Sequence, residues 1–406
     1  MATATKNPFI IGHPALGEDL ADRVSEVARL ERAFADPSSR LLIYGERRLG
    51  KSSIVGEAAA RTRKAKRPVI VVDLAKVTSV EGAAKAILEG LNKEMGRRWS
   101  NVATSIIARF KSSRVQFGAQ PDPAGGVPTV TFSVVPSEET EKDPGRLLIE
   151  TLDAVEQESA ARNEQIGLAL DEFQRLSHWI PKVDWLLKGA FDEHRRVAYV
   201  LSCSERSVIN AMIDSKREGG LFKMVDVMSV GPIPTELFAP WIMKRAAATR
   251  VGFDRSVAEA IIAVAGARTR DVVQLARHVW DATHMAGHAT LQDVSAGMDD
   301  LVREQSAHHQ ATWHRLKSDT HRRILILLAK SPSTELTASS TLRSYRLGSK
   351  TTVSRMLKTL ITDEHVVEEN GRHHVDDPFF RRWIEIHAFK EFSFPTPSLL
   401  NRASST

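Results

Sequence analysis

A stretch near the amino terminus has the residue types and the spacing of a phosphate-binding loop. Four residues separate Gly45 from Gly50, and Lys51 and Ser52 follow directly, which fits the pattern G-x-x-x-x-G-K-[ST]. The glycines let the backbone curl so that successive N–H groups, with the N-terminus of the following helix, face phosphate oxygens. In this pattern the lysine reaches the β- and γ-phosphates and the serine ligates Mg²⁺, so the sequence predicts a nucleotide-binding loop.

A second group of candidate catalytic residues follows two later apolar runs. Asp171 and Glu172 come directly after "IGLAL". In a nucleotide hydrolase such a pair holds Mg²⁺ through water and polarises the attacking water, so we assign Asp171 to the metal and Glu172 to the water. An ordinary strand end would be the better interpretation of the pair alone, but the phosphate loop favours the catalytic one. Ser202 and Ser204, at the end of "VAYVLSCS", are placed to meet the γ-phosphate or the water, although ordinary loop serines fit nearly as well.

The elements around these residues are typical of a parallel α/β sheet. Residues 41–44 are apolar without interruption, which predicts a buried parallel strand, and residues 51–64 predict a helix that ends in basic residues. The stretch between the loop and the acidic pair is too long for one strand–helix–strand step. We therefore expect a hairpin insertion at about 96–142 and then a helix over 144–163, within a core domain of residues 1–231.

The rest of the chain predicts two further domains. Residues 232–315 contain only helical patterns and are expected to form a helical lid that closes on the nucleotide. Residues 316–392 have the order helix, helix-turn-helix, hairpin, with turns at Leu347-Gly348 and Asn370-Gly371, which is the order of a winged helix. Residues 393–406 are expected to be a flexible tail.

The second helix of the predicted helix-turn-helix is basic. Between Lys317 and Lys358 the chain has nine Lys and Arg residues against two acidic ones. In DNA-binding winged helices this helix lies in the major groove and the wing touches phosphate. The candidate contacts to double-stranded DNA are Lys350, Thr351, Arg355, Lys358 and, on the wing, Arg372. Winged helices also dock onto proteins, and Glu368 and Glu369 on the wing argue against a phosphate contact, so a protein partner stays open.

Several of these motifs resemble those of a known family. "YGERRLGKSSI" is very similar to the Tyr-Gly-x-Arg-Arg-x-Gly-Lys-[Ser/Thr]-Ser signature of the archaeal-type P-loop ATPases, an AAA+-related group, and "LALDEFQRL" resembles its Asp-Glu-Phe-Gln motif. The group is similar to replication-initiator ATPases and to STAND signalling ATPases. The resemblance covers nearly the whole chain. It implies an AAA+-like α/β core with a helical lid and a winged helix, ATP or ADP with Mg²⁺ as cofactors, and ATP hydrolysis.

The resemblance also implies roles for residues outside the two motifs. Asn7, Pro8 and Phe9 match the family's Asn-Pro-Phe opening, which lies near the adenine. Arg23 matches the arginine of its Arg-x-x-Glu-Leu helix, and alignment of the lid helix places the sensor arginine at Arg270, with Arg268 as the second choice. The expected nucleotide contacts of the loop are Gly45, Glu46, Arg47, Arg48, Leu49, Gly50, Lys51, Ser52 and Ser53.

The composition limits the class of protein. With 406 residues, 42% of them hydrophobic and 26% charged, the chain has the composition of two or three globular domains. A single cysteine excludes a disulfide framework and a multi-cysteine zinc site. No apolar run approaches the roughly 18 residues that span a membrane, and the start lacks the pattern of a signal peptide, so we expect a cytoplasmic protein. The net charge of +6 permits an anionic partner.

The sequence therefore predicts an ATP-binding, Mg²⁺-dependent ATPase that acts as a nucleotide switch for a DNA-binding winged helix, of the initiator, mobile-element or defence type. The alternative is a STAND-like signalling ATPase whose winged helix packs on the nucleotide and contacts protein partners. Assembly into a homo-oligomer, with an arginine acting on a neighbouring subunit, is left open.

Overall fold

The computed structural model describes residues 6–389, except for 96–109, 111–112, 121–128, 137, 139–142, 206–207, 210–211, 213–218, 222, 267, 332–334 and 370. Contacts divide the chain into two compact units. The sheet unit comprises Ile10–Pro234 and Arg268–Arg270. The helical unit comprises the described parts of Met1–Phe9, Thr235–Ala267 and Asp271–Thr406.

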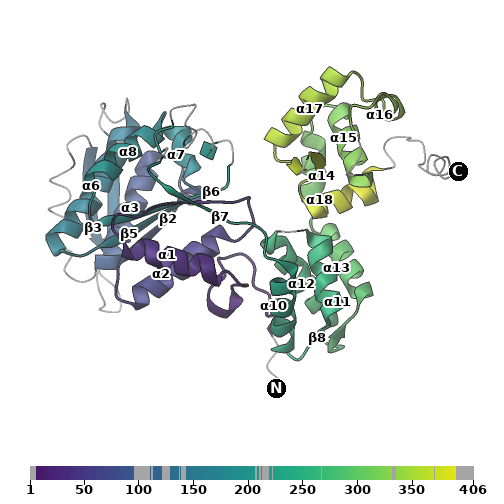
Figure 1. Cartoon of the computed structure of the whole chain (residues 1–406), viewed down its shortest axis with the longest axis horizontal. Helices are drawn as coiled ribbons and strands as arrows, with labels where there is room; N and C mark the ends of the chain where they lie inside the picture. Colours follow the sequence, from purple (N-terminus) through teal and green to yellow (C-terminus); the bar gives the residue numbers. More distant parts are fainter. Residues whose placement is uncertain are drawn as a thin grey trace. The chain divides into compact units, whose positions relative to one another are not determined.

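The sheet unit is built on five parallel strands in the order β2-β5-β6-β1-β7 (Figure 1). They are β1 (Arg40–Tyr44), β2 (Val69–Asp73), β5 (Ile166–Asp171), β6 (Val197–Cys203) and β7 (Asp226–Ser229). Because the strands are parallel, their carboxyl ends all lie at one edge of the sheet and their amino ends at the other. The predicted strand after residue 40 and the parallel α/β class are thereby confirmed.

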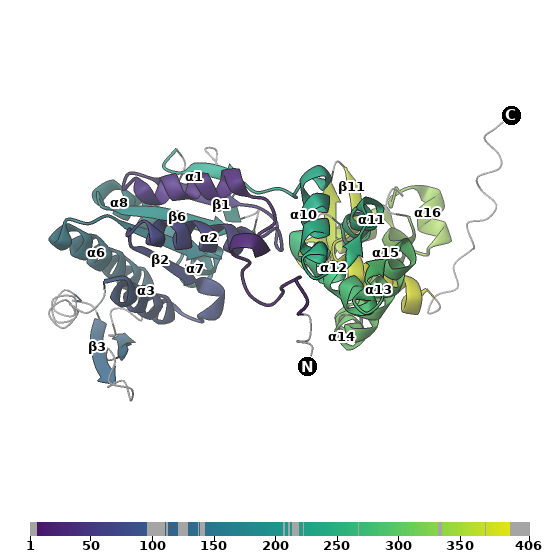
Figure 2. The same ribbon diagram turned by 90° about the horizontal axis from the view of Figure 1, so that it is seen from below.

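Helices cover both faces of this sheet (Figures 1 and 2). In β1, Leu41 and Ile43 pack in one core cluster and Leu42 in another, because successive side chains of a strand point to opposite faces. One face carries α1 (Val24–Ala35) and α2 (Lys51–Lys64). The other carries α3 (Val80–Met95), α6 (Pro144–Arg162) and α8 (Val183–Glu193). Short helices are η1 (Gly17–Asp19), η2 (Leu74–Lys76) and α7 (Gln174–Trp179).

The expected insertion lies partly outside the described residues. Within it, β3 (Ser113–Gln120) and β4 (Thr129–Pro136) form the antiparallel hairpin that the alternating pattern predicts. Phe132 of β4 is buried in the same core cluster as α3. The hairpin is therefore anchored on the helical layer at the β2 side of the sheet, and α6 follows it as expected.

The helical unit begins with the four helices expected for the lid. They are α10 (Thr235–Ala247), α11 (Arg255–Ala265), α12 (Thr269–Thr283), whose first two residues belong to the sheet unit, and α13 (Leu291–Glu304). Thr290 caps α13 through a capping box with Asp293. A further helix, α14 (Ser306–Arg315), and two short strands, β8 (Gly252–Phe253) and β9 (His288–Ala289), were not expected.

The predicted winged helix is confirmed in its order of elements. It consists of α15 (Asp319–Lys330), α16 (Ser339–Ser344), α17 (Lys350–Thr362), β10 (Val366–Glu369) and β11 (Arg372–Val375), followed by α18 (Pro378–Trp383) and η5 (Ile384–Ala388). Gly348 makes the turn with a φ of 84°, and Ser349 caps α17 by accepting a hydrogen bond from the Thr352 N–H. Asn370 and the expected tail over 393–406 lie outside the described residues.

The helices of the lid and the winged helix fall in the same compact unit, so the limits 1–231, 232–315 and 316–392 stay a prediction. Across the described ranges, no helix is both long and apolar enough to cross a membrane.

Candidate nucleotide-binding site

The predicted phosphate loop joins the carboxyl end of β1 to the start of α2. Gly45 follows β1 and lies against the residue that follows β7, where a Cβ atom would be only 2.4 Å from the Val230 carbonyl oxygen. Arg48 and Gly50 have φ angles of 69° and 91°, in the left-handed region, so the chain turns sharply before α2 begins at Lys51. Strand, turn and helix therefore follow one another as the sequence predicts.

The close approach at Gly45 gives a test of the loop's packing. We expect Gly45→Ala to lower the free energy of unfolding by about 1–3 kcal/mol, because the added methyl group overlaps a backbone oxygen that cannot move alone. Gly189→Ala, in open space on α8, is the matched control and should be neutral or stabilising. Denaturant unfolding of both variants measures the difference, and equal stabilities would contradict the packing argument.

Lys51 is held inside this loop. Its side chain is 4% exposed, and its ammonium donates hydrogen bonds to the carbonyl oxygens of Gly45 and Glu46, both at 2.7 Å. Burial lowers the pKa of the ammonium, while the Glu172 and Asp171 carboxylates act in the opposite direction. Neutral carbonyls offset only part of the cost of burying the charge, so an anionic phosphate is a better partner for this group.

Asp171 and two hydroxyl groups form an oxygen-rich cluster beside Lys51. Asp171 ends β5 with a side chain 5% exposed, and burial raises the pKa of its carboxyl group, which the hydroxyls of Ser202 and Ser52 oppose. Ser202 is buried, and its Oγ forms no hydrogen bond of ordinary geometry. A carboxylate and a serine hydroxyl are hard oxygen ligands of the kind that Mg²⁺ takes together with phosphate and water. The described part of the chain has no group of three or more His, Cys, Asp or Glu side chains that could hold a metal.

Glu172 is held by two neighbours at the same edge. The Ser204 hydroxyl donates to Glu172 Oε2 at 2.8 Å, and Gln174 Nε2 donates both to Glu172 Oε2 and, at 3.0 Å, to Ser204 Oγ. Glu172 itself has a φ of 55°, which turns the chain directly after the strand. Gln174 is 2% exposed and was missed by the sequence reasoning, although it is the last residue of the Asp-Glu-Phe-Gln motif.

Arg23 forms a hydrogen bond with the backbone of the phosphate loop. Its buried guanidinium donates to the Leu49 carbonyl at 3.2 Å and to the Gly231 carbonyl at 2.6 Å, and it pairs with Glu26 at 2.9 Å. Arg23 thus contacts the loop through the loop's backbone, and a contact of Arg23 with the nucleotide stays a prediction. Gly231 lies just beyond β7, so one side chain ties the loop to the end of the neighbouring strand.

The backbone of Arg270, the predicted sensor arginine, and the side chain of the neighbouring Thr269 contact the loop. Within the sheet unit the Arg270 N–H donates to the Arg48 carbonyl at 3.0 Å, and the Thr269 hydroxyl donates to the Leu49 carbonyl at 3.4 Å. The Arg270 side chain is exposed. These bonds join the first turn of α12 to the phosphate loop.

The predicted adenine contacts belong to the other compact unit. Phe9 is buried between the rings of Trp241 and Phe253, with ring centroids 6.1 and 6.0 Å away. The Asn7 side-chain amide donates to the Arg277 carbonyl, and Arg245 donates to the carbonyl of Pro8. These contacts lie within the helical unit, and a role of Asn7, Pro8 and Phe9 near the adenine stays a prediction.

The side chains of the predicted DNA contacts are all exposed on the winged helix. On α17, Val353 and Leu360 are buried, whereas Lys350, Thr351, Arg355 and Lys358 are all exposed. Among the described residues no carboxylate pairs with the three basic side chains of this helix. Arg372 is exposed on β11, and on the same hairpin His373 Nε2 lies 3.6 Å from Glu368.

Comparisons with known proteins identify two domains in the chain. A family model described as "KAP family P-loop domain" matches residues 18–221, half of the chain, and one described as "Probable winged helix domain" matches residues 307–386. No curated protein sequence matches the chain.

Two solved structures show the same fold at low sequence identity. The Walker-type ATPase PABY2304 of Pyrococcus abyssi has a TM-score of 0.59 and 17% identity, over 93% of this chain and 99% of that one. The ORC2 protein of Aeropyrum pernix, in its ADPNP–ADP complexes, has a TM-score of 0.56 and 14% identity, over 94% and 96%. The fold is thus AAA+-like, and the expected P-loop core with a C-terminal winged helix is confirmed. The chain belongs to the KAP family of P-loop NTPases.

Proposed function

We propose that this P-loop NTPase is a Mg²⁺-dependent ATPase that acts as a nucleotide switch for a DNA-binding winged helix. The observation that carries the proposal is the meeting of Lys51, Ser52, Asp171 and Glu172 at the carboxyl edge of one parallel sheet. Ligands of open α/β sheets bind at this edge, and these side chains are the set that phosphoryl transfer needs.

Each residue of the set has a separate task. Lys51 exchanges its carbonyl partners for phosphate oxygens and neutralises charge there. Ser52 and Asp171 would hold Mg²⁺, which when bound withdraws charge from the phosphate oxygens. Glu172 orients a water for attack on the γ-phosphorus and takes its proton as the bond to the bridging oxygen breaks. Ser204 keeps the Glu172 carboxylate in place for this step.

The backbone of the loop provides a route for switching. The carbonyls of Arg48 and Leu49 accept hydrogen bonds from the first turn of α12, and Leu49 also accepts one from Arg23. Because α12 continues into the helical unit, a change in the loop when phosphate binds or leaves alters the start of a helix of that unit. A ligand shifts a conformational equilibrium only when its contacts differ between the two conformations, and these hydrogen bonds can supply such a difference.

The DNA-binding part of the proposal rests on the exposed basic face of α17. We expect Arg355→Ala with Lys358→Ala to weaken binding of duplex DNA and to reduce the salt slope by about 1.8, since each lost phosphate contact removes about 0.9. Fluorescence anisotropy of labelled duplex DNA at several salt concentrations, with ATP, with ADP and with neither, is the measurement.

A matched control removes the same charge elsewhere in the helical unit. Lys244→Ala with Arg255→Ala takes one exposed lysine and one exposed arginine from α10 and α11, and this variant should keep the wild-type slope. Equal slopes in all three proteins would remove α17 as the contact. No DNA binding in any nucleotide state would favour the STAND-like alternative, for which the Glu368 carboxylate on the wing is the supporting observation.

A further inference from the structure

The sheet unit has a cationic hollow at the amino edge of its sheet. Arg40 begins β1 and Arg195 precedes β6, so this edge lies opposite the phosphate loop, which follows the end of β1. The hollow has a volume of about 290 Å³ and its described lining includes Arg40, Arg195 and Lys223. Among the described residues that line it, none carries a carboxylate.

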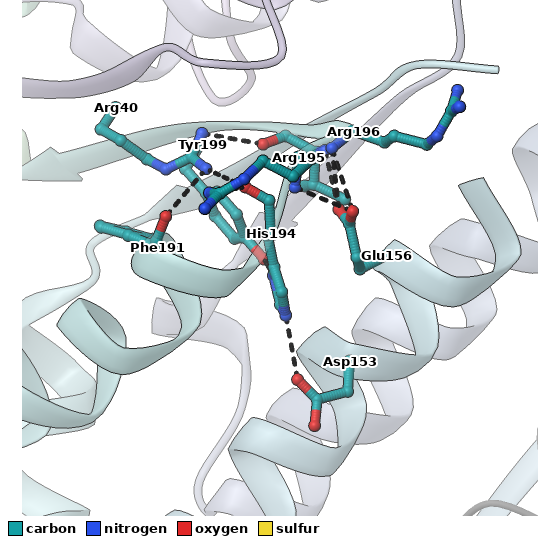
Figure 3. A network of polar contacts seen from close by, with 9 residues as sticks. Arg40, Asp153, Glu156, Phe191, His194, Arg195, Arg196 and Tyr199 are labelled. Carbon is teal, nitrogen blue, oxygen red and sulfur yellow. Dashed lines mark hydrogen bonds and ion pairs between the residues drawn. The ribbon is translucent and has the colours of Figure 1, made fainter. Parts of the chain in front are cut away.

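Arg40 places a buried positive charge beneath the hollow. Its side chain is 8% exposed, and its guanidinium lies over the rings of Phe191 and Tyr199, with centroids 5.2 and 5.1 Å away (Figure 3). Five backbone carbonyls accept its Nη hydrogen bonds, those of Pro37, Ser39, Phe191, His194 and Val197. Its Nε has no hydrogen-bond partner in the part of the chain that the structure describes. The buried charge is therefore solvated by neutral groups, which offset less of the desolvation cost than an anion does.

A second guanidinium adds to this charge. The side chain of Arg195 extends toward Arg40 and Phe191, whereas that of Arg196 points away from them (Figure 3). Burial lowers the pKa of Arg40, and the nearby charge of Arg195 acts in the same direction, whereas the carboxylates of Glu156 and Asp36 oppose this shift. The two like charges at the hollow repel each other, and an anion bound between them would offset this repulsion by its attraction to both.

Two carboxylates that act electrostatically on Arg40 accept their hydrogen bonds from other groups. Glu156 of α6 accepts hydrogen bonds from the backbone N–H groups of Arg195, Arg196 and Val197 (Figure 3). Asp36 accepts them from the N–H and the hydroxyl of Ser38, at 2.9 and 2.7 Å. Both carboxylates act on the charge of Arg40, but neither is among the described residues that line the hollow.

We propose that this hollow binds a phosphoryl oxyanion, with Arg195 and Lys223 as its charged donors and Arg40 as the buried charge below them. A phosphoryl group suits the hollow because it offers several acceptor oxygens and matches the fork of a guanidinium. Two sources present this group, a small phosphorylated molecule and the backbone of a nucleic acid. The site is separate from the proposed ATPase centre, and its existence does not depend on the proposed function.

The test uses the full chain with Lys51→Ala, so that the phosphate loop contributes as little as possible to phosphate binding. Calorimetric titration with inorganic phosphate, at an ionic strength held constant with potassium chloride, measures the affinity. Arg195→Gln with Lys223→Gln in the same background should weaken phosphate binding about tenfold or more, because two charge-assisted donors are lost. Both side chains are exposed, so the fold should be retained.

Arg196→Gln is the matched control, since it removes a neighbouring arginine that does not line the hollow. Its phosphate affinity should equal that of the parent. A second arm measures binding of a short DNA duplex to the same three proteins. Loss of phosphate binding alone assigns the site to a small phosphorylated molecule, and a parallel loss of DNA affinity assigns it to a nucleic-acid backbone. If the double variant and the control behave alike in both arms, the proposal is wrong.

Discussion

Replacing Lys51 with alanine is expected to abolish nucleotide binding by the full chain. The ammonium is buried in the loop, where it donates hydrogen bonds to the carbonyls of Gly45 and Glu46. With nucleotide these bonds are replaced by charge-assisted bonds to phosphate oxygens, each worth about 1.5–3 kcal/mol. Loss of two of them corresponds to an affinity at least about 100-fold lower.

Titration of a fluorescent ATP analogue into wild-type protein and variant measures this effect. Lys85→Ala, which removes a half-exposed lysine from α3, is the control for loss of charge and should bind as the wild type does. Thermal unfolding establishes whether the Lys51 variant keeps its fold, because the substitution leaves two loop carbonyls without their donor. Unchanged ATP affinity in a folded Lys51→Ala variant would contradict the assignment of the loop.

The parts of the fold that could be predicted are those with strong local signals. The apolar run before Gly45 and the Gly-Lys-Ser sequence define β1 and α2. A glycine follows the end of the strand, and the helix begins where its backbone N–H groups can donate hydrogen bonds to a phosphate. The winged helix was predictable for the same reason. Gly348, Ser349 and the two amphipathic helices on either side mark its turn, its cap and its packed faces.

Other elements could not be predicted because distant parts of the chain determine them. β7 has only four residues, of which Met228 alone is buried, and it becomes a strand by pairing with β1 at the edge of the sheet. α14 carries adjacent histidines and few apolar residues, and it buries only His309 and Trp313. Neither segment has a periodic pattern that separates it from a loop.

The same distinction applies to the candidate site. The two motifs supplied Lys51, Ser52, Asp171 and Glu172, because each lies at a fixed position next to a strand. The bonds that hold them join residues far apart in the chain: Arg23 and Gly231 are 208 positions apart, and Gln174 and Ser204 are 30 apart. A single sequence gives no register between such segments, so the support of the site appears only once the sheet is assembled.

Glu172→Gln is expected to retain ATP and to lose turnover. Glutamine has the shape of glutamate, and its amide oxygen can still accept the hydrogen bonds of Ser204 and Gln174, so the strand end should keep its structure. It cannot take a proton from the attacking water. General base catalysis contributes about 10²–10⁴-fold, so the rate constant for hydrolysis should fall by that factor while the affinity for ATP stays within about threefold.

Single-turnover hydrolysis and equilibrium ATP binding, measured on the same preparations, separate these two effects. Glu193→Gln, an exposed glutamate at the end of α8, removes the same charge away from the site and should leave both quantities unchanged. A variant that bound ATP poorly would show that Glu172 supports the loop rather than the water. Hydrolysis at the wild-type rate would remove Glu172 from catalysis and shift the role of base to another group at the carboxyl edge.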